Sequence, residues 1–201
     1  IQDPGAALVT VYADPPPGSR VADLCAAPGG KALALANQGA RVLAADRSLP
    51  RLRVLQENLA RLGREMDLVV ALAQAPALAQ VPFVLLDVPC TGTGTLRRHP
   101  DARWRLTLDM LDRLVELQQR ILRAGAQLVP PGGVLVYSTC TLEEEENESQ
   151  VEAFFNAHGD FLLEETGALP PGFLDHEGCL RVVPQSSGFD GAFAARMVRT
   201  A

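Results

Sequence analysis

The chain has 201 residues, of which 47% are hydrophobic and 21% charged, and its formal net charge is −6 at pH 7. This length and apolar fraction suit one well-buried α/β domain, and no apolar run is long enough to span a membrane. The negative charge argues against a general nucleic-acid binder, so any contact with RNA requires a local basic patch. Four cysteines at irregular spacing match neither a disulfide framework nor a CxxC metal site, and no secretory signal is apparent. We therefore expect a reducing, cytoplasmic location and no bound metal.

Residues 2–5 are polar and predict a turn at the start of the chain. The first predicted strand starts at Val21 and runs into small residues and paired glycines, followed by a helix from about Lys31. Glycines allow a ligand to approach the backbone closely, and the new helix presents free N–H groups. The segment is not GxGxxG, and no GxxxxGK[ST] occurs, so neither a dinucleotide nor a phosphate-cradling loop is predicted.

A second strand over residues 41–45 ends at Asp46, where an acidic residue can hold ribose hydroxyls. Together with the glycine-rich segment, it favours a nucleoside ligand without a pyrophosphate. S-adenosylmethionine is the common ligand of this kind.

The rest of the chain continues the alternation of strands and helices, with no internal repeat. We predict helices over residues 49–62 (ending at Gly63), 108–128 and 144–157, strands over 68–71, 83–86 and 134–138, and an antiparallel edge hairpin from 180–183 and 192–198. Residues 91–105 are rich in glycine and arginine and are predicted to be irregular. Strand–helix alternation predicts right-handed parallel units, with the active edge at the carboxyl ends of the strands.

Two cysteines each follow an apolar strand directly, Cys90 after residues 85–88 and Cys140 after residues 136–139. Either one alone is best explained as a buried structural cysteine, because free cysteine is among the most buried residue types. Together, at the sheet edge where a cofactor site is predicted, they favour a paired chemical task. The residues alone do not assign which cysteine does what.

Three strings now carry a family resemblance: DLCAAPGGK at residues 23–31, DVPCTGTG at 87–94 and STCT at 138–141. They resemble the signature motifs of RNA cytosine-C5 methyltransferases, and LRRHPDARW at 96–104 resembles the bacterial Sun/Fmu (RsmB) group that modifies 16S ribosomal RNA. FDGAF at 189–193 resembles that group's last motif, with Asp190 in place of the usual aromatic residue.

The resemblance implies a single catalytic domain over residues 1–201 with the Rossmann-like, class I S-adenosylmethionine-dependent methyltransferase fold. The amino-terminal helical RNA-binding domain of full-length members is absent from these residues. Because the chain starts at Ile1 rather than methionine, we expect it to be the catalytic part of a longer protein.

The resemblance also implies roles for individual residues. Cys140 is the expected nucleophile, Cys90 is expected to assist release of the adduct, and Asp87 is expected to contact the cytosine ring or the methionine end of the cofactor. The expected cofactor-binding residues are Cys25, Ala26, Ala27, Pro28, Gly29, Gly30, Lys31, Asp46, Arg51 and Asp87. In one departure, Leu72 stands where relatives place an aspartate near the adenine.

We expect a local basic patch next to Cys90 to be the RNA-binding surface. Its residues are Arg97, Arg98, His99 and Arg103, with Arg105 close by. We expect the protein to be a monomer. Trp104 is expected to pack this loop against the core rather than to stack on a base. Residues 143–146, all glutamate, are expected to stabilise the start of a helix rather than to act in catalysis.

Two other functions remain open at this point. The chain could be a Rossmann-like methyltransferase for another substrate, such as a protein amide or a free nucleobase, although amine methylation needs no paired cysteines. It could also be a catalytically silent RNA-binding module with a weakened cofactor site. Intact Cys90, Cys140 and Asp46 argue against that second alternative.

Overall fold

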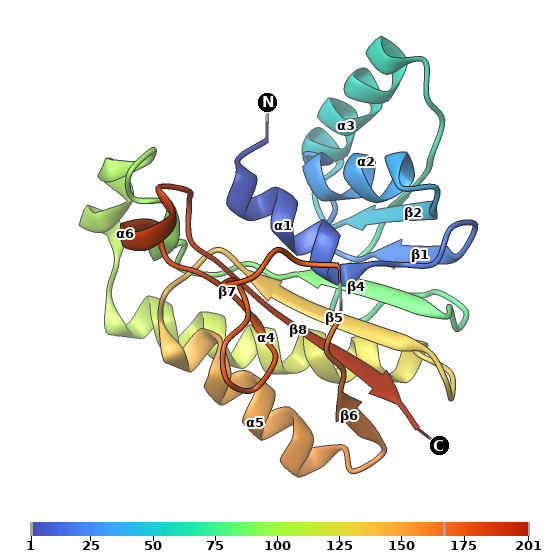
Figure 1. Cartoon of the computed structure of the whole chain (residues 1–201). Helices are drawn as coiled ribbons and strands as arrows, with labels where there is room; N and C mark the ends of the chain where they lie inside the picture. The colour runs from blue at the N-terminus through green and yellow to red at the C-terminus, as the bar shows by residue number, and fades with distance from the viewer. Residues whose placement is uncertain (1, 167, 201) are drawn as a thin grey trace.

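The computed structural model describes residues 2–166 and 168–200, and Figure 1 shows them as one sheet between two layers of helices. The strands are β1 (Arg20–Asp23), β2 (Arg41–Asp46), β3 (Asp67–Val70), β4 (Phe83–Asp87), β5 (Val134–Thr139), β6 (Phe161–Leu163), β7 (Leu180–Val182) and β8 (Ala192–Arg199). The α-helices are α1 (Pro4–Ala13), α2 (Gly30–Asn37), α3 (Leu49–Leu62), α4 (Leu108–Leu128), α5 (Glu148–Ala157) and α6 (Pro184–Ser187). Three short 3₁₀ turns are η1 (Thr93–Thr95), η2 (Pro100–Arg105) and η3 (Glu144–Glu146).

The sheet has the order β3-β2-β1-β4-β5-β8-β6, and β7 also pairs with β8. The first five strands in this order are parallel, and β8 runs antiparallel to β5, β6 and β7. The chain order reverses between β1 and β4, and in open α/β sheets this switch point opens a crevice at the carboxyl ends of the strands. The predicted Rossmann-like, mostly parallel fold is confirmed.

Two apolar cores flank the sheet. Helices α1, α2 and α3 cover one face and bury side chains such as Tyr12, Leu35 and Leu55, while α4 and α5 cover the other with Ile121 and Phe154 (Figure 1). Strands β4 and β5 are buried almost throughout, because helices cover them on both faces. The site at their carboxyl ends is therefore built on the central, most buried strands of the sheet.

Local sequence explains the helix boundaries. The Ser48 hydroxyl accepts a hydrogen bond from the N–H of Arg51 at the start of α3, and Gly63 ends that helix with φ 61°. Thr107 caps α4 in the same way, accepting from the N–H of Met110. Both helices begin and end where the sequence predicts.

Three features differ from the predictions. Residues 144–157 do not form one helix, because Asn147 takes a non-helical backbone (φ −116°, ψ −98°) that separates η3 from α5. The predicted hairpin of β7 and β8 is present, but β8 lies inside the sheet and β6 forms the edge. Helix α1 begins where only a turn was expected, because Asp3 caps it and Pro4 begins it.

Candidate active site

The two cysteines meet at the carboxyl edge of the sheet. Cys90 follows β4, Cys140 follows β5, and the two strands pair in parallel with Asp87 opposite Ser138. Their Sγ atoms lie 3.5 Å apart, and the N–H of Cys140 donates to Cys90 Sγ over 3.4 Å. Both side chains are half-buried, so an incoming ligand can reach them.

The surroundings of the two thiols shift their pKa values in opposite directions. A hydrogen bond from Cys90 lowers the pKa of Cys140 below its ordinary value, and the Lys31 ammonium adds to this effect. The same hydrogen bond, together with burial, raises the pKa of Cys90 well above its ordinary value. Since the thiolate is the nucleophilic form of cysteine, these pKa directions favour ionisation at Cys140 and retention of the proton at Cys90.

Asp87, the last residue of β4, links this pair to the glycine-rich loop. Its Oδ2 lies 2.9 Å from Lys31 Nζ, and its Oδ1 accepts a hydrogen bond from the Ser138 hydroxyl at 3.0 Å. Burial alone would lower the pKa of Lys31, but the charge and hydrogen bond of Asp87 raise it above its ordinary value. Lys31 is therefore a fixed cation between the loop and Cys140.

Asp46 and Gly29 fix the shape of the loop between β1 and α2. The N–H of Ala27 donates to Asp46 Oδ2 over 3.2 Å, and the N–H of Ser48 donates to Oδ1 over 2.9 Å. Gly29 has φ 108°, and a Cβ on it would collide with the Leu55 side chain. Loop and helix thus pack too closely for any residue but glycine.

Arg51 completes this bracing from α3. Its guanidinium donates to the carbonyl oxygen of Ala27 and lies 3.7 Å from Asp46 Oδ2. The side chain remains more than half exposed. Arg51 therefore lies at the predicted cofactor site, and its contacts here are to the loop itself.

Asp23, at the end of β1, is a site residue that sequence reasoning did not single out. Its Oδ1 accepts from the N–H of Cys25, but Oδ2 is buried without a hydrogen-bond partner among the described residues. Burial, and next the charge of Asp87, raise the pKa of Asp23 to about 7. Its position as the last residue of a strand before the glycine-rich loop could have identified Asp23 as a candidate residue from the sequence.

Glu146 was expected to stabilise the start of a helix, and this was wrong. It is fully buried and accepts hydrogen bonds from the N–H of Thr91 (2.9 Å), from the Thr91 hydroxyl and from Gln118 Nε2 (2.8 Å). Thr91 directly follows Cys90, so this carboxylate fixes the Cys90 loop. A buried carboxylate can be held by neutral donors when enough of them converge on it.

Asn147 holds the neighbouring Cys140 loop. It accepts from the Thr139 hydroxyl at 2.6 Å and donates to the carbonyl oxygen of Thr141 at 3.2 Å. The next residue, Glu148, instead forms an ion pair with Arg181 on β7. Glu146 thus contacts the Cys90 loop, Asn147 contacts the Cys140 loop, and Glu148 contacts the outer part of the sheet.

A family model described as 16S rRNA methyltransferase RsmB/F matches residues 10–198. The chain belongs to this family. Ribosomal RNA small subunit methyltransferase B from Thermus thermophilus is 40% identical over an alignment of 202 positions that covers 98% of this chain and 49% of the relative. The same-named protein of Erwinia tasmaniensis is 38% identical over 206 residues, covering 99% of this chain and 46% of the relative. The chain thus spans about half the length of the curated relatives it matches.

Solved structures agree with this placement in the RsmB/F family. NSun6 from Pyrococcus horikoshii with SFG superposes with a TM-score of 0.89 at 30% identity, over 100% of this chain and 53% of that one. A methyltransferase homolog protein from the same organism gives a TM-score of 0.82 at 32% identity, over 100% of this chain and 67% of that one. The family is one of S-adenosylmethionine-dependent methyltransferases, which confirms the predicted cofactor class.

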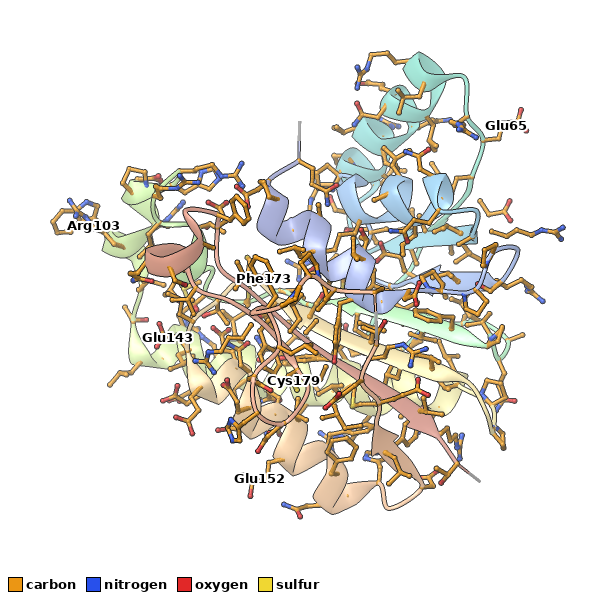
Figure 2. All side chains as sticks on the ribbon, viewed as in Figure 1. Glu65, Arg103, Glu143, Glu152, Phe173 and Cys179 are labelled. Atoms are coloured by element: carbon orange, nitrogen blue, oxygen red, sulfur yellow. The ribbon has the colours of Figure 1, made fainter. Side chains whose placement is uncertain are left out.

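The predicted RNA-binding arginines of this RsmB/F chain are partly engaged with carboxylates. Arg98 Nε donates to Asp190 Oδ2 over 2.6 Å, and Arg97 lies 3.7 Å from Asp190 and 3.8 Å from Asp3. Both arginine side chains remain about half exposed. His99 is exposed, and Figure 2 shows Arg103 projecting from the body of the molecule.

Trp104 was expected to pack the loop against the core, and this was wrong. Its side chain is 78% exposed, because η2 holds it on the outer surface.

Leu72, at the predicted adenine position after β3, is also exposed (49%), and Gln74, two residues further on, is half-buried. The position expected to face the adenine thus carries an exposed apolar side chain with an amide two residues further on.

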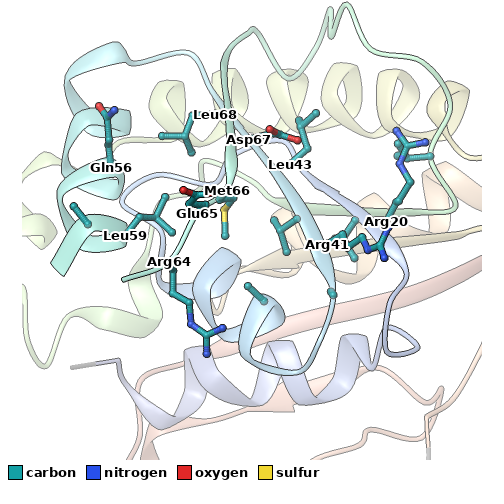
Figure 3. A pocket seen from close by; sticks show the side chains of 16 residues that line it. Arg20, Arg41, Leu43, Gln56, Leu59, Arg64, Glu65, Met66, Asp67 and Leu68 are labelled. Carbon is teal, nitrogen blue, oxygen red and sulfur yellow. The ribbon is translucent and has the colours of Figure 1, made fainter. Parts of the chain in front are cut away.

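A large hollow of about 920 Å³ lies elsewhere (Figure 3). It is lined by Arg20, Arg41 and Asp67, the first residues of β1, β2 and β3, and by Leu59 and Arg64 near the end of α3. It therefore opens at the amino ends of the strands, opposite the cysteines.

Among the described residues, no helix is both long and apolar enough to cross a membrane, and no three His, Cys, Asp or Glu side chains cluster as metal ligands would.

Proposed function

We propose that this chain transfers a methyl group from S-adenosylmethionine to C5 of a cytosine in RNA, with 16S ribosomal RNA as the substrate. The observation that carries the proposal is the pair of free thiols 3.5 Å apart, at the sheet edge that also holds the glycine-rich loop. Methylation of an amine or amide needs no such pair, because no covalent adduct to a base is required there. Membership of the RsmB/F family supports ribosomal RNA as the substrate.

The residues at the switch point fit the cofactor. The loop 25–31 would lie along its methionine portion, and Asp46 would bind the ribose hydroxyls. Asp23 Oδ2, buried and without a partner among the described residues, is a free acceptor at the same loop and suits an ammonium group. Bound there, S-adenosylmethionine supplies an electrophilic methyl group to a nucleophile in the adjoining crevice.

The chemistry explains why two cysteines are needed. Cytosine C5 is a weak nucleophile, and addition of the Cys140 thiolate to C6 breaks the C5–C6 double bond and makes C5 enamine-like. C5 would then form a bond to the methyl carbon while the bond between that carbon and the sulfonium sulfur breaks, and the demethylated cofactor would leave as a neutral thioether. Afterwards the C5 proton must be removed, and the electrons of that C–H bond restore the double bond as the Cys140–C6 bond breaks. Cys90, 3.5 Å from Cys140, is placed to assist this release.

Asp87 and Lys31 position the reacting groups. Asp87 presents a partly exposed carboxylate at the edge between the loop and the cysteines, where it can hydrogen-bond the cytosine ring. Lys31 favours the thiolate of Cys140 by its charge. Arg97, Arg98, His99 and Arg103 would contact the RNA backbone next to Cys90.

Methyl transfer to naked 16S ribosomal RNA tests the proposal directly. With isotopically labelled S-adenosylmethionine, we expect the label in 5-methylcytidine after complete digestion of the RNA. The same assay with Cys140→Ala controls for contaminating activity and should give no label. Label in another nucleoside, or in a protein acceptor instead of RNA, would contradict the proposal.

A further inference from the structure

We infer that Trp104 and Arg103 form a stacking site for an RNA base next to the catalytic cysteines. The inference deepens the proposed function and rests on it for the identity of the ligand. The Trp104 side chain is 78% exposed. This exposure rules out a role for Trp104 as an anchor of the loop in the core, and it leaves a large amphipathic ring, of the kind enriched at interaction surfaces, open to a partner.

The guanidinium of Arg103 defines one side of the site. Its Cζ lies 4.8 Å from the centroid of the Trp104 ring, within the range of a cation–π contact. Within residues 2–166 and 168–200, no carboxylate lies within ion-pair distance of Arg103, so its charge is available to a phosphate. With 78% of its side chain exposed, Trp104 leaves most of its ring to solvent, where a base can stack on it.

Backbone contacts tie this site to the active centre. Trp104 lies on η2, which packs against η1, and the N–H of Gly94 in η1 donates to the carbonyl oxygen of Cys140 over 3.1 Å. A Cβ on Gly94 would lie 2.7 Å from that same oxygen, so the two segments touch without room between them. A nucleotide flanking the target cytosine is thus the natural occupant of the Trp104 surface.

Charge favours RNA over a protein as this occupant. Residues 97–105 contain four arginines, whereas the whole chain carries a net charge of −6. A cationic segment that also exposes an aromatic ring is the usual composition of a single-strand binding surface, in which bases stack and phosphates pair with arginine. Stacking tolerates every base, so this site would add affinity without strict sequence choice.

Trp104 is the only tryptophan of the chain, so its fluorescence reports this site alone. A single-stranded oligoribonucleotide containing cytosine, titrated at low salt, should quench the emission in a saturable way. Trp104→Ala should weaken binding of a dye-labelled copy of the same oligonucleotide by roughly five- to 150-fold, as loss of one stacked base predicts. Trp104→Phe should keep part of the affinity.

The matched control is Leu108→Ala, which removes a neighbouring exposed apolar side chain and should leave RNA affinity unchanged. Two results would overturn the stacking site and favour a protein partner for this surface. One is tryptophan emission that does not change as RNA is added up to saturation, and the other is equal RNA affinity of Trp104→Ala and wild type. Quenching should persist in Cys140→Ala. If it persists while the wild type methylates no cytosine, the stacking site stands and the proposed reaction falls.

Discussion

The carboxylate of Glu146 accepts a hydrogen bond from the backbone N–H of Thr91 over 2.9 Å, across 55 residues of sequence. Thr91 follows Cys90, and Glu146 follows the Cys140 loop, so this contact joins the two strand ends that carry the thiols. The charge of Glu146 also opposes ionisation of both cysteines. The charge of Lys31 has the opposite effect and favours the Cys140 thiolate.

Replacing Glu146 by alanine should lower the free energy of unfolding by about 1–3 kcal/mol, because Thr91 and Gln118 lose the acceptor of their buried donors. It should also slow release of the RNA from the enzyme more than it slows formation of the bond, since Cys90 is no longer held in place. Denaturant unfolding and single-turnover kinetics measure the two effects. The neighbouring Glu145→Ala, which changes an exposed carboxylate, is the control and should leave both unchanged.

Asp23 should make stability fall as the pH rises. Its folded pKa is raised from 3.8 to about 7, so the folded state holds a proton that the unfolded state has already lost between these values. The associated stability is complete below about pH 4 and is lost as the pH approaches 7. Three pH units correspond to about 4 kcal/mol as an upper limit.

The test compares Asp23→Asn with wild type by urea unfolding at several pH values. The variant cannot ionise, so its stability relative to wild type should increase from pH 4 to pH 7 and then level off. A constant difference between the two proteins across this range would mean that Asp23 keeps an ordinary pKa in the folded state.

Asp46→Ala should weaken binding of S-adenosylmethionine by roughly 1.5–3 kcal/mol, the loss expected for a charge-assisted hydrogen bond. Asp46 also accepts from the N–H groups of Ala27 and Ser48, so the variant should be less stable as well. Titration calorimetry with the folded variant measures affinity, and unchanged affinity would remove Asp46 from the cofactor site. The companion variant Leu72→Asp should retain binding and can tighten it.

Reversing Arg97 and Arg98 to glutamate should weaken RNA binding and flatten its dependence on salt. For a single strand, removing one arginine–phosphate pair reduces the slope of log affinity against log salt by about 0.7. Because Arg98 hydrogen-bonds Asp190, whereas Arg97 makes only longer ion pairs with Asp190 and Asp3, Arg98→Gln should reduce stability more than Arg97→Gln. Equal slopes in the double variant and wild type would assign this segment a structural role.

The sequence predicted the fold well, because β1, β2, β4 and β5 of the parallel sheet are short apolar runs that end at a polar residue. It also placed Cys90, Cys140, Asp87 and Asp46 at strand ends. Their meeting could not follow from the residues alone, since it depends on β4 and β5 being neighbours in the sheet. That adjacency is a property of topology.

The sequence failed where burial contradicts local pattern. A run of four glutamates is typical of a solvated helix start, yet its last member, Glu146, is fully buried against donors distant in sequence. A lone tryptophan is typical of a packed loop, yet Trp104 is exposed. Asp3 and Pro4 are typical of a helix start and do begin α1, but the short polar segment around them resembles a turn, so the helix was not predicted.

In the proposed reaction, Cys140 forms a covalent bond to the cytosine and Cys90 helps to break it. The measurement is denaturing electrophoresis of Cys90→Ala after incubation with 16S ribosomal RNA and S-adenosylmethionine. We expect a protein–RNA adduct that survives denaturation and carries the methyl group, no adduct with Cys140→Ala, and none with the double variant.

Cofactor binding and unfolding of each variant serve as controls and should match wild type. An adduct formed by Cys140→Ala but not by Cys90→Ala would reverse the two roles. Full turnover by both single variants, with no adduct in either, would contradict the covalent mechanism.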